Sequence, residues 1–297
     1  MTLAIVYTRA SIGLDAPLVT VEAHISNGLP GLTLVGLPET AVKEARDRVR
    51  SAMVNSGFEY PVKKMTVNLA PADLPKESGR YDLAIAIAIL AASGQIPDQL
   101  LEHHEFLGEL ALSGDIRYVN GGIPAAQAAI HQNRQLILSK DNQYQLSLLA
   151  DSSVYFAASL LELCHYLHQK STLSSNQQVI QHAYPSDHEN DIRDIIGQEQ
   201  GKRALEISAA GGHNLLLLGP PGTGKTMLAH RLITLLPPLT PQEALEVTAL
   251  HSLSQTMETI NKWPARPFRC PHHNTSMTAL IGGGSLPKPG EISLAHH

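Results

Sequence analysis

Residues 219–226, Gly-Pro-Pro-Gly-Thr-Gly-Lys-Thr, constrain the fold more than any other part of this sequence. They match the P-loop pattern, in which a glycine-rich turn joins a buried strand to a helix and holds phosphate groups. Both flanks fit this pattern. Residues 214–218 include four consecutive leucines, typical of a strand buried on both faces, and residues 225–236 have the apolar spacing of a helix. We therefore predict a strand–loop–helix unit, and with it an α/β domain, around the motif.

The positions within the loop have distinct predicted roles. Gly222 and Gly224 let backbone amides point at phosphate oxygens, and the following helix adds the partial positive charge of its N-terminus. We expect Lys225 to reach the β and γ phosphates and the hydroxyl of Thr226 to bind Mg²⁺. A glycine-rich turn without a ligand is the alternative, and the Lys-Thr pair with both correct flanks disfavours it. The rest of the predicted phosphate cradle is Gly219, Pro220, Pro221 and Thr223.

A polar, irregular segment at residues 171–190 divides the chain of 297 residues into two parts. We predict one domain at residues 1–170, a linker at 171–190 and a second domain at 191–297, sizes that are ordinary for protein domains. The two cysteines are too few and too far apart for a disulfide framework. No run of eighteen apolar residues occurs, so we expect no membrane segment. The apolar N-terminus lacks a basic flank and is interrupted by Arg9, unlike a signal peptide, so we expect a cytoplasmic protein.

Charge is distributed unevenly between these parts. Residues 1–190 hold clearly more acidic than basic side chains, whereas residues 191–297 are nearly balanced. Because an acidic surface repels a phosphate backbone, any nucleic acid is expected to meet the second part.

The first part alternates between strand and helix patterns. Residues 39–56 have the spacing of an amphipathic helix, whereas residues 82–92 are apolar on all sides and predict a buried helix. Ser113-Gly114-Asp115 separates two short apolar runs, 106–112 and 116–119, as in a hairpin. This mixture predicts an α/β or α+β domain. The other predicted strands are 18–25, 32–35, 65–69, 136–138 and 154–157, and the other predicted helices are 123–130 and 160–167.

The wording of the P-loop resembles that of AAA+ ATPases rather than that of small GTPases or kinases. Residues 194–198, Asp-Ile-Ile-Gly-Gln, look like the AAA+ segment that lies against the adenine ring. The resemblance implies ATP as the nucleotide, with Ile196 as an apolar wall and Gly197 allowing close backbone approach. A plain entry into a helix at 200–210 is the other interpretation, and the two are compatible.

Three stretches together resemble the ComM/YifB branch of Mg-chelatase-like AAA+ proteins. This resemblance implies a Lon-protease-like (ribosomal S5 domain 2-like) α+β domain followed by a P-loop AAA+ α/β domain. It also implies a hexameric ring that acts on single-stranded or branched DNA as a helicase, driving branch migration during natural transformation. The stretches are residues 28–31 with 35–39, residues 211–214 before the P-loop, and residues 266–273 with 282–284 and 289–296.

The same resemblance implies that the AAA+ domain is incomplete in this sequence. In the family, the segment that ends here at residues 293–296 runs into an apolar strand ending in Asp-Glu, the Walker B carboxylates. No such strand follows Thr226, and Walker B, the sensors, the arginine finger and the helical lid would lie beyond His297. Because hydrolysis needs a carboxylate and a transition-state cation, we expect nucleotide binding without useful ATPase activity.

Lon-type proteases use a Ser/Lys pair. The resemblance places the nucleophile at Tyr81 or Asp82 and the lysine at Pro124, so we predict no catalytic residue in this domain. Ser78 beside Lys76 is a residual alternative, disfavoured because sequence neighbours face apart on most backbones.

Two interpretations apply to the Cys/His-rich segment near the end of the sequence. Cys270-Pro271-His272-His273, with His251, His296 and His297 nearby, resembles a zinc site, but the second cysteine of a closed site is absent and we predict no metal here. Alternatively, Arg266, Arg269, His272 and His273 line the pore of the ring and contact DNA phosphates. An ordinary surface loop explains the two arginines about equally well.

Two other classes of function remain open at this point. One is a remodelling chaperone of the metal-chelatase type, in which the same motor acts on an enzyme that metallates a porphyrin. The other is a non-catalytic binding or regulatory module. The Lon-like first domain favours the ComM/YifB branch, because chelatase motors resemble this sequence only in the AAA+ part.

Overall fold

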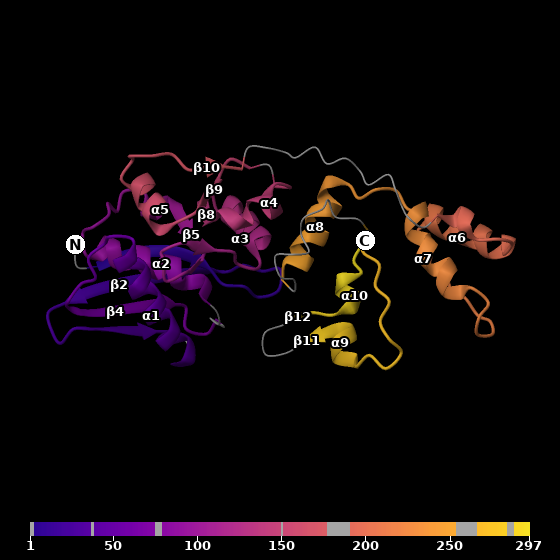
Figure 1. Cartoon of the computed structure of the whole chain (residues 1–297), viewed down its shortest axis with the longest axis horizontal. Coiled ribbons are helices and arrows are strands. Elements are labelled where there is room, and N and C mark those ends of the chain that lie inside the picture. The colour runs from indigo at the N-terminus through magenta and orange to yellow at the C-terminus, as the bar shows by residue number, and fades with distance from the viewer. Residues whose placement is uncertain are drawn as a thin grey trace.

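The computed structural model describes residues 3–36, 39–74, 79–149, 151–176, 191–253, 266–283 and 288–297. The first part of the chain is a sheet covered by helices, and the second part extends from one side of it (Figure 1). Helices α6 (Glu199–Gly211) and α7 (Lys225–Leu235) lie at the far end, and α8 (Pro241–Ser252) lies between them and the sheet. No helix in the described ranges is long and apolar enough to cross a membrane.

An eight-stranded mixed sheet forms the centre of the first part, in the order β10-β9-β8-β5-β1-β2-β4-β3. The pairs β1/β2, β2/β4 and β9/β10 are antiparallel, and the other four pairs are parallel. This mixture confirms the predicted α/β class. The strands are β1 (Leu3–Arg9), β2 (Leu18–Ser26), β3 (Gly31–Val35), β4 (Lys64–Ala70), β5 (His104–Phe106), β8 (Gln135–Ser139), β9 (Val154–Ala157) and β10 (Ser174–Ser175).

Helix α2 (Asp82–Ala92) is the core of the first part, and all of its residues are buried. It packs against β1 and β2 on one side and against α1 (Glu39–Asn55) on another, so no face of it needs polar side chains. Each isoleucine or leucine buried there contributes about 1.5–3 kcal/mol to folding. The predicted hairpin also forms, as β6 (Glu109–Leu110) with β7 (Ile116–Arg117) beside the start of α2.

Alternate side chains of the sheet supply two apolar layers. One layer lies against α2 and α5 (Leu160–Leu167) and includes Val6, Val21 and Ile137. The other layer lies against α3 (Gly122–His131) and includes Leu138 and Phe156. The parallel strands β5, β8 and β9 are therefore covered on both faces, whereas the outward side chains Leu3 and Ile5 of β1 are exposed.

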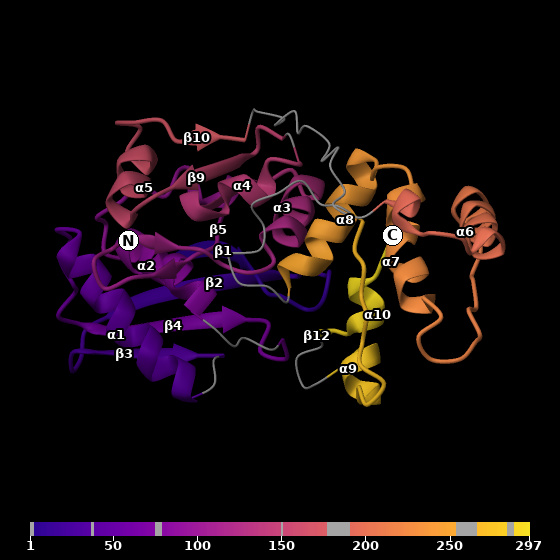
Figure 2. The same cartoon turned by 45° about the vertical axis from the view of Figure 1, so that its right-hand side comes forward.

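Helix α8 connects the two parts of the chain. Its N-terminus carries a capping box, in which Thr240 and Glu243 each bind the other's backbone N–H, and Pro241 follows at the first helical position. Ala249 of α8 enters the apolar cluster of α3 and the sheet, and α3 and α8 lie side by side (Figure 2). The short elements that follow are α9 (Met277–Ile281), β11 (Gly282–Gly283), β12 (Lys288–Pro289) and α10 (Glu291–Leu294).

One local prediction was wrong. Residues 214–218 do not form a strand, and Leu216 and Leu218 are 78% and 85% exposed. A buried strand depends on neighbouring strands, and no described strand pairs with this segment. Ser174–Ser175, inside the predicted linker, pairs with β9 as the edge strand β10, while residues 177–190 of that linker lie outside the described ranges.

Candidate nucleotide-binding site

The P-loop has a backbone suited to binding an anion. Gly222 and Gly224 have φ angles of +80° and +85°, a region that only glycine adopts without strain. Gly224 is the N-cap residue of α7, and no side chain caps this helix. The first N–H groups of α7 are therefore directed into the loop together with the positive end of the helix dipole.

Lys225 and Thr226 begin α7, as the motif requires. The ammonium of Lys225 donates hydrogen bonds to the carbonyls of Gly219 (2.9 Å) and Pro220 (2.6 Å), so the side chain folds back over the loop. The hydroxyl of Thr223 also donates to Pro220 (2.9 Å), and Thr226 is exposed one residue into the helix. A cation and a hydroxyl thus lie beside the loop amides, the chemistry that phosphate and Mg²⁺ need.

The segment 194–198 lies beside this loop. The side-chain amide of Gln198 donates to the Thr223 carbonyl (3.3 Å), and Ile195 joins Leu205 and Leu228 in a small buried core between α6 and α7. Ile196 is 97% exposed, and Gly197 has a φ of +71°. The fold therefore brings an exposed apolar side chain near the P-loop, and its contact with an adenine ring stays a prediction.

Both arginines that we considered for DNA contact are bound within the chain. The guanidinium of Arg269 makes two hydrogen bonds to the carboxylate of Glu291 (2.6 and 2.7 Å), which raises the pKa of Arg269 above its usual value. Arg266 donates to the carbonyls of Pro237 (2.6 Å) and His297 (2.7 Å). DNA would have to displace the carboxylate from Arg269, so this part of the predicted DNA contact stays a prediction.

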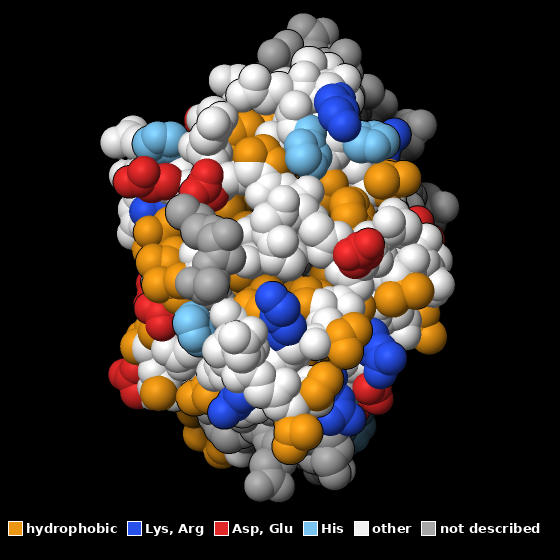
Figure 3. All heavy atoms as spheres, turned by 90° about the vertical axis from the view of Figure 1, so that its left-hand side faces the viewer, with side chains coloured by type: hydrophobic (Ala, Val, Ile, Leu, Met, Phe, Trp, Pro, Cys, Tyr) orange, Lys and Arg blue, Asp and Glu red, His pale blue; other side chains and the backbone are white. Residues whose placement is uncertain are grey.

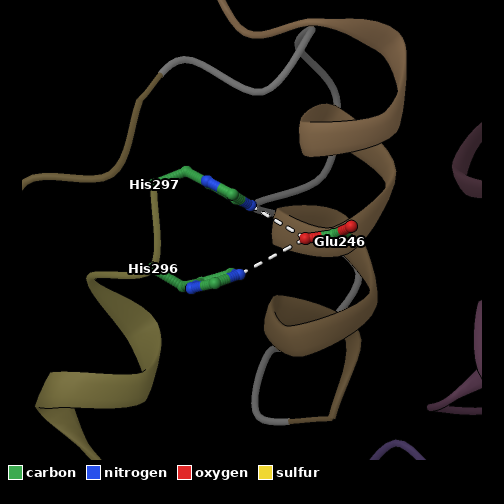
Figure 4. Close-up of side chains that lie close together, drawn as sticks. All are labelled: Glu246, His296 and His297. Carbon is green, nitrogen blue, oxygen red and sulfur yellow. Dashed lines mark hydrogen bonds and ion pairs between the residues drawn. The ribbon is translucent and has the colours of Figure 1, made fainter.

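Two pairs of histidines from the predicted Cys/His-rich segment and the end of the sequence lie apart from each other. His272 and His273 stack on each other, with ring centroids 4.0 Å apart, and Cys270 is exposed. His296 and His297 instead meet Glu246 of α8 (Figure 4), at 3.4 and 2.8 Å from their Nε2 atoms to the Glu246 carboxylate.

The group of Glu246, His296 and His297 offers three metal-ligand atoms, all within 4.8 Å of one another. It is the one described group of three such residues, and it excludes Cys270. Both histidines stand out in the sequence, whereas Glu246 does not, since 50 residues separate it from His296 along the chain.

The positions that correspond to the Lon-type catalytic pair are all buried: Tyr81, Asp82 and Pro124. Asp82 begins α2 and accepts a 2.6 Å hydrogen bond from Arg48 of α1. Burial raises the pKa of Asp82 to about 6, against the opposing effect of Arg48. Ser78 and Lys76 lie outside the described residues.

Among the described residues, the face of the first part turned away from the P-loop shows no continuous basic area. Basic, acidic and apolar side chains of described residues are interspersed there (Figure 3). This face lacks the electrostatic footprint expected of a nucleic-acid surface.

Comparison with known proteins identifies relatives for both parts. The family described as "Magnesium chelatase, subunit ChlI" matches residues 191–297, which hold the P-loop. The family described as "Subunit ChlI of Mg-chelatase" matches residues 21–142 of the first part.

Whole proteins match as well. YifB of Salmonella typhimurium and YifB of Escherichia coli are each 57% identical over 297 residues, all of this chain. The competence protein ComM of Haemophilus influenzae is 56% identical over 298 residues and 99% of the chain. The chain belongs to the ComM/YifB family of Mg-chelatase-like proteins. It spans 58% of the length of these three relatives.

Proposed function

We propose that this chain is the ATP-binding portion of an AAA+ motor that acts on DNA. The observation that carries the proposal is the P-loop, in which Gly222 and Gly224 direct amides into the loop while Lys225 and Thr226 begin an uncapped helix. ATP would bind with its phosphates at this loop and Mg²⁺ at Thr226, and its base would lie against Ile196 and Gly197.

Nucleotide binding is tested with a fluorescent ATP analogue in the presence of Mg²⁺. Lys225→Ala should weaken binding roughly 10- to 150-fold, the range for losing one charge-assisted hydrogen bond to phosphate. Lys288→Ala is the matched control, because Lys288 is an exposed lysine on β12, outside the P-loop. Equal affinity of wild type and Lys225→Ala would refute the proposed site.

Thr226→Ala separates the metal from the phosphates. Since the hydroxyl is the proposed Mg²⁺ ligand, this variant should lose most of the Mg²⁺ dependence of binding while keeping affinity for the nucleotide alone. We further infer that residues 1–297 do not hydrolyse ATP steadily, because no apolar strand ending in Asp-Glu follows Thr226 in the sequence. Magnesium-dependent turnover that Lys225→Ala abolishes would contradict this inference.

The role on DNA is supported by the likeness to a protein named for competence, together with the near-balanced charge of residues 191–297. We infer a homo-oligomeric ring, a hexamer, that drives branch migration. The test uses the full-length protein on Holliday-junction DNA, with Lys225→Ala as the inactive motor. Arg266→Ala with Arg269→Ala should lower DNA binding and spare nucleotide binding, whereas unchanged DNA affinity would remove these residues from the proposal.

A second candidate is favoured by the family descriptions, which name a magnesium chelatase subunit for both parts of the chain. In that case, the motor would remodel a metal-inserting enzyme instead of moving DNA. ATP-dependent stimulation of magnesium insertion into a porphyrin, without branch migration, would select this candidate.

A further inference from the structure

Two of the three guanidinium nitrogens of the buried Arg80 have no hydrogen-bond partner among the described residues. Arg80 is 6% exposed, and neither its Nε nor its Nη2 has a hydrogen-bond partner among the described residues. Burial lowers the pKa of Arg80, and the one charge effect that opposes it comes from Tyr81 rather than from a carboxylate. A buried cation without an anion is costly, since the charge loses its hydration and gains nothing in return.

Arg80 lies at the N-terminus of α3. A Cβ atom on Gly121, the N-cap residue of α3, would lie 3.9 Å from Nη1 of Arg80 and 3.3 Å from the hydroxyl of Ser11. Gly121 has a φ of +70°, and no side chain caps the helix. The amides of Gly122 and Ile123 therefore lack the capping acceptor that most helices provide, and the positive end of the helix dipole adds to the charge of Arg80.

A second buried donor lies near the same turn. Gln145 is 3% exposed, and its Nε2 has no partner among the described residues. Its Oε1 lies 3.6 Å from a Cβ built on Gly122 and accepts a hydrogen bond from Tyr118 (3.4 Å). The side-chain oxygen of Gln145 thus has a hydrogen-bond donor, whereas its side-chain nitrogen has no acceptor among the described residues.

The unsatisfied side-chain atoms of Arg80 and Gln145 in the described structure are all donors, and Arg80 carries a positive charge. We propose that Arg80, Gln145 and the first amides of α3 bind a small oxyanion of the phosphate or carboxylate class. Two hydrogen bonds from the guanidinium fork match two oxygens of such an anion, and the helix amides bind a third. The site lies in the first part of the chain, and it does not depend on the proposed function of the P-loop.

The experiment uses the whole chain carrying Lys225→Ala, so that phosphate does not report on the P-loop. Inorganic phosphate and acetate are titrated separately against chloride at constant ionic strength. The readout is the ¹H–¹⁵N signal of the Arg80 side-chain Nε, assigned by its loss in Arg80→Lys. We expect this signal to shift saturably with at least one of the two anions, and the response to phosphate or acetate names the preferred class.

Variants then locate the bound anion. Arg80→Lys keeps the positive charge but cannot donate two parallel hydrogen bonds as a guanidinium does. It should raise the anion concentration that is needed to stabilise the protein roughly tenfold. Gln145→Leu should weaken it as well and is the variant to use if Arg80→Lys does not fold. Arg117→Lys, on an arginine whose side chain is 62% exposed, is the matched control and should change nothing.

Two results would overturn the proposal. One is an Arg80 signal that neither anion moves, which is also the outcome if the chain itself supplies the acceptor. The other is anion-dependent stabilisation of equal size in wild type, Arg80→Lys and Gln145→Leu.

Discussion

The carboxyl group of Asp82 makes a strong prediction about the pH dependence of folding. It lies at the start of the core helix α2 and is 1% exposed. Arg48 donates two hydrogen bonds to it, at 2.6 and 3.3 Å, which favours the charged form. Burial favours the neutral form more strongly and raises the pKa from 3.8 to about 6.

The sign of the effect follows from proton binding. An acid with a raised pKa binds its proton more tightly in the folded state, so its contribution to stability is complete below the unfolded pKa. This contribution is lost as pH rises through the folded pKa of about 6. A shift of about two units corresponds to roughly 3 kcal/mol in the free energy of unfolding, lost between about pH 4 and pH 7.

Urea denaturation of wild type and Asp82→Asn across this pH range isolates the effect, because asparagine has a similar shape and does not titrate. The stability of wild type minus that of Asp82→Asn should fall by about 3 kcal/mol from pH 4 to pH 7. Asp98→Asn removes an exposed aspartate and should keep the wild-type profile. A difference between wild type and Asp82→Asn that is constant with pH, or that rises, would refute the reasoning.

Three further substitutions test the packing. Arg9→Met should cost about 3–5 kcal/mol in urea denaturation, because it removes the closer guanidinium from the buried carboxylate of Glu105 and leaves only Arg134, at 3.9 Å. A loss below about 1 kcal/mol would contradict the buried ion pair. Gly36→Ala should lower Tm, since its φ is +90° and its Cβ would lie 2.5 Å from the Leu69 carbonyl, whereas Gly31→Ala meets no atom within 4 Å and is the control. Thr240→Ala removes the cap of α8 and should cost about 1 kcal/mol, and an unchanged Tm would show that the cap is dispensable.

Apolar patterning predicted the helices and strands of the first part well, because the pattern of each one is contained in consecutive residues. The limits of α2 at residues 82–92 were correct, since every side of that segment is apolar and Asp82 marks its start. The strand at 214–218 could not be decided in this way. The same four leucines suit a buried strand only where neighbouring strands cover them, and that information lies elsewhere in the chain.

Buried charges were the main features that sequence reasoning missed. Charged side chains ordinarily mark the surface, so nothing in the sequence indicates that Arg9 and Arg80 are buried. The partner of Arg9 is Glu105, 96 residues away on β5, and Nε and Nη2 of Arg80 have no hydrogen-bond partner among the described residues. Such residues are found from tertiary packing, whereas the P-loop was found from sequence because its chemistry is contained in eight consecutive residues.

The start of α3 joins features that the sequence separates widely. The backbone N–H of Gly121 donates to the carbonyl of Ser252 in the last turn of α8 (3.3 Å), and Leu253 lies 3.5 Å from a Cβ built on Gly121. The proposed anion site at Arg80 is therefore in contact with the helix through which the second part packs on the first. Because Ala249 packs α8 into the cluster with α3 and the Ser252 carbonyl binds the turn, an anion bound at Arg80 would lie against the end of α8, where it would affect how the second part packs on the first.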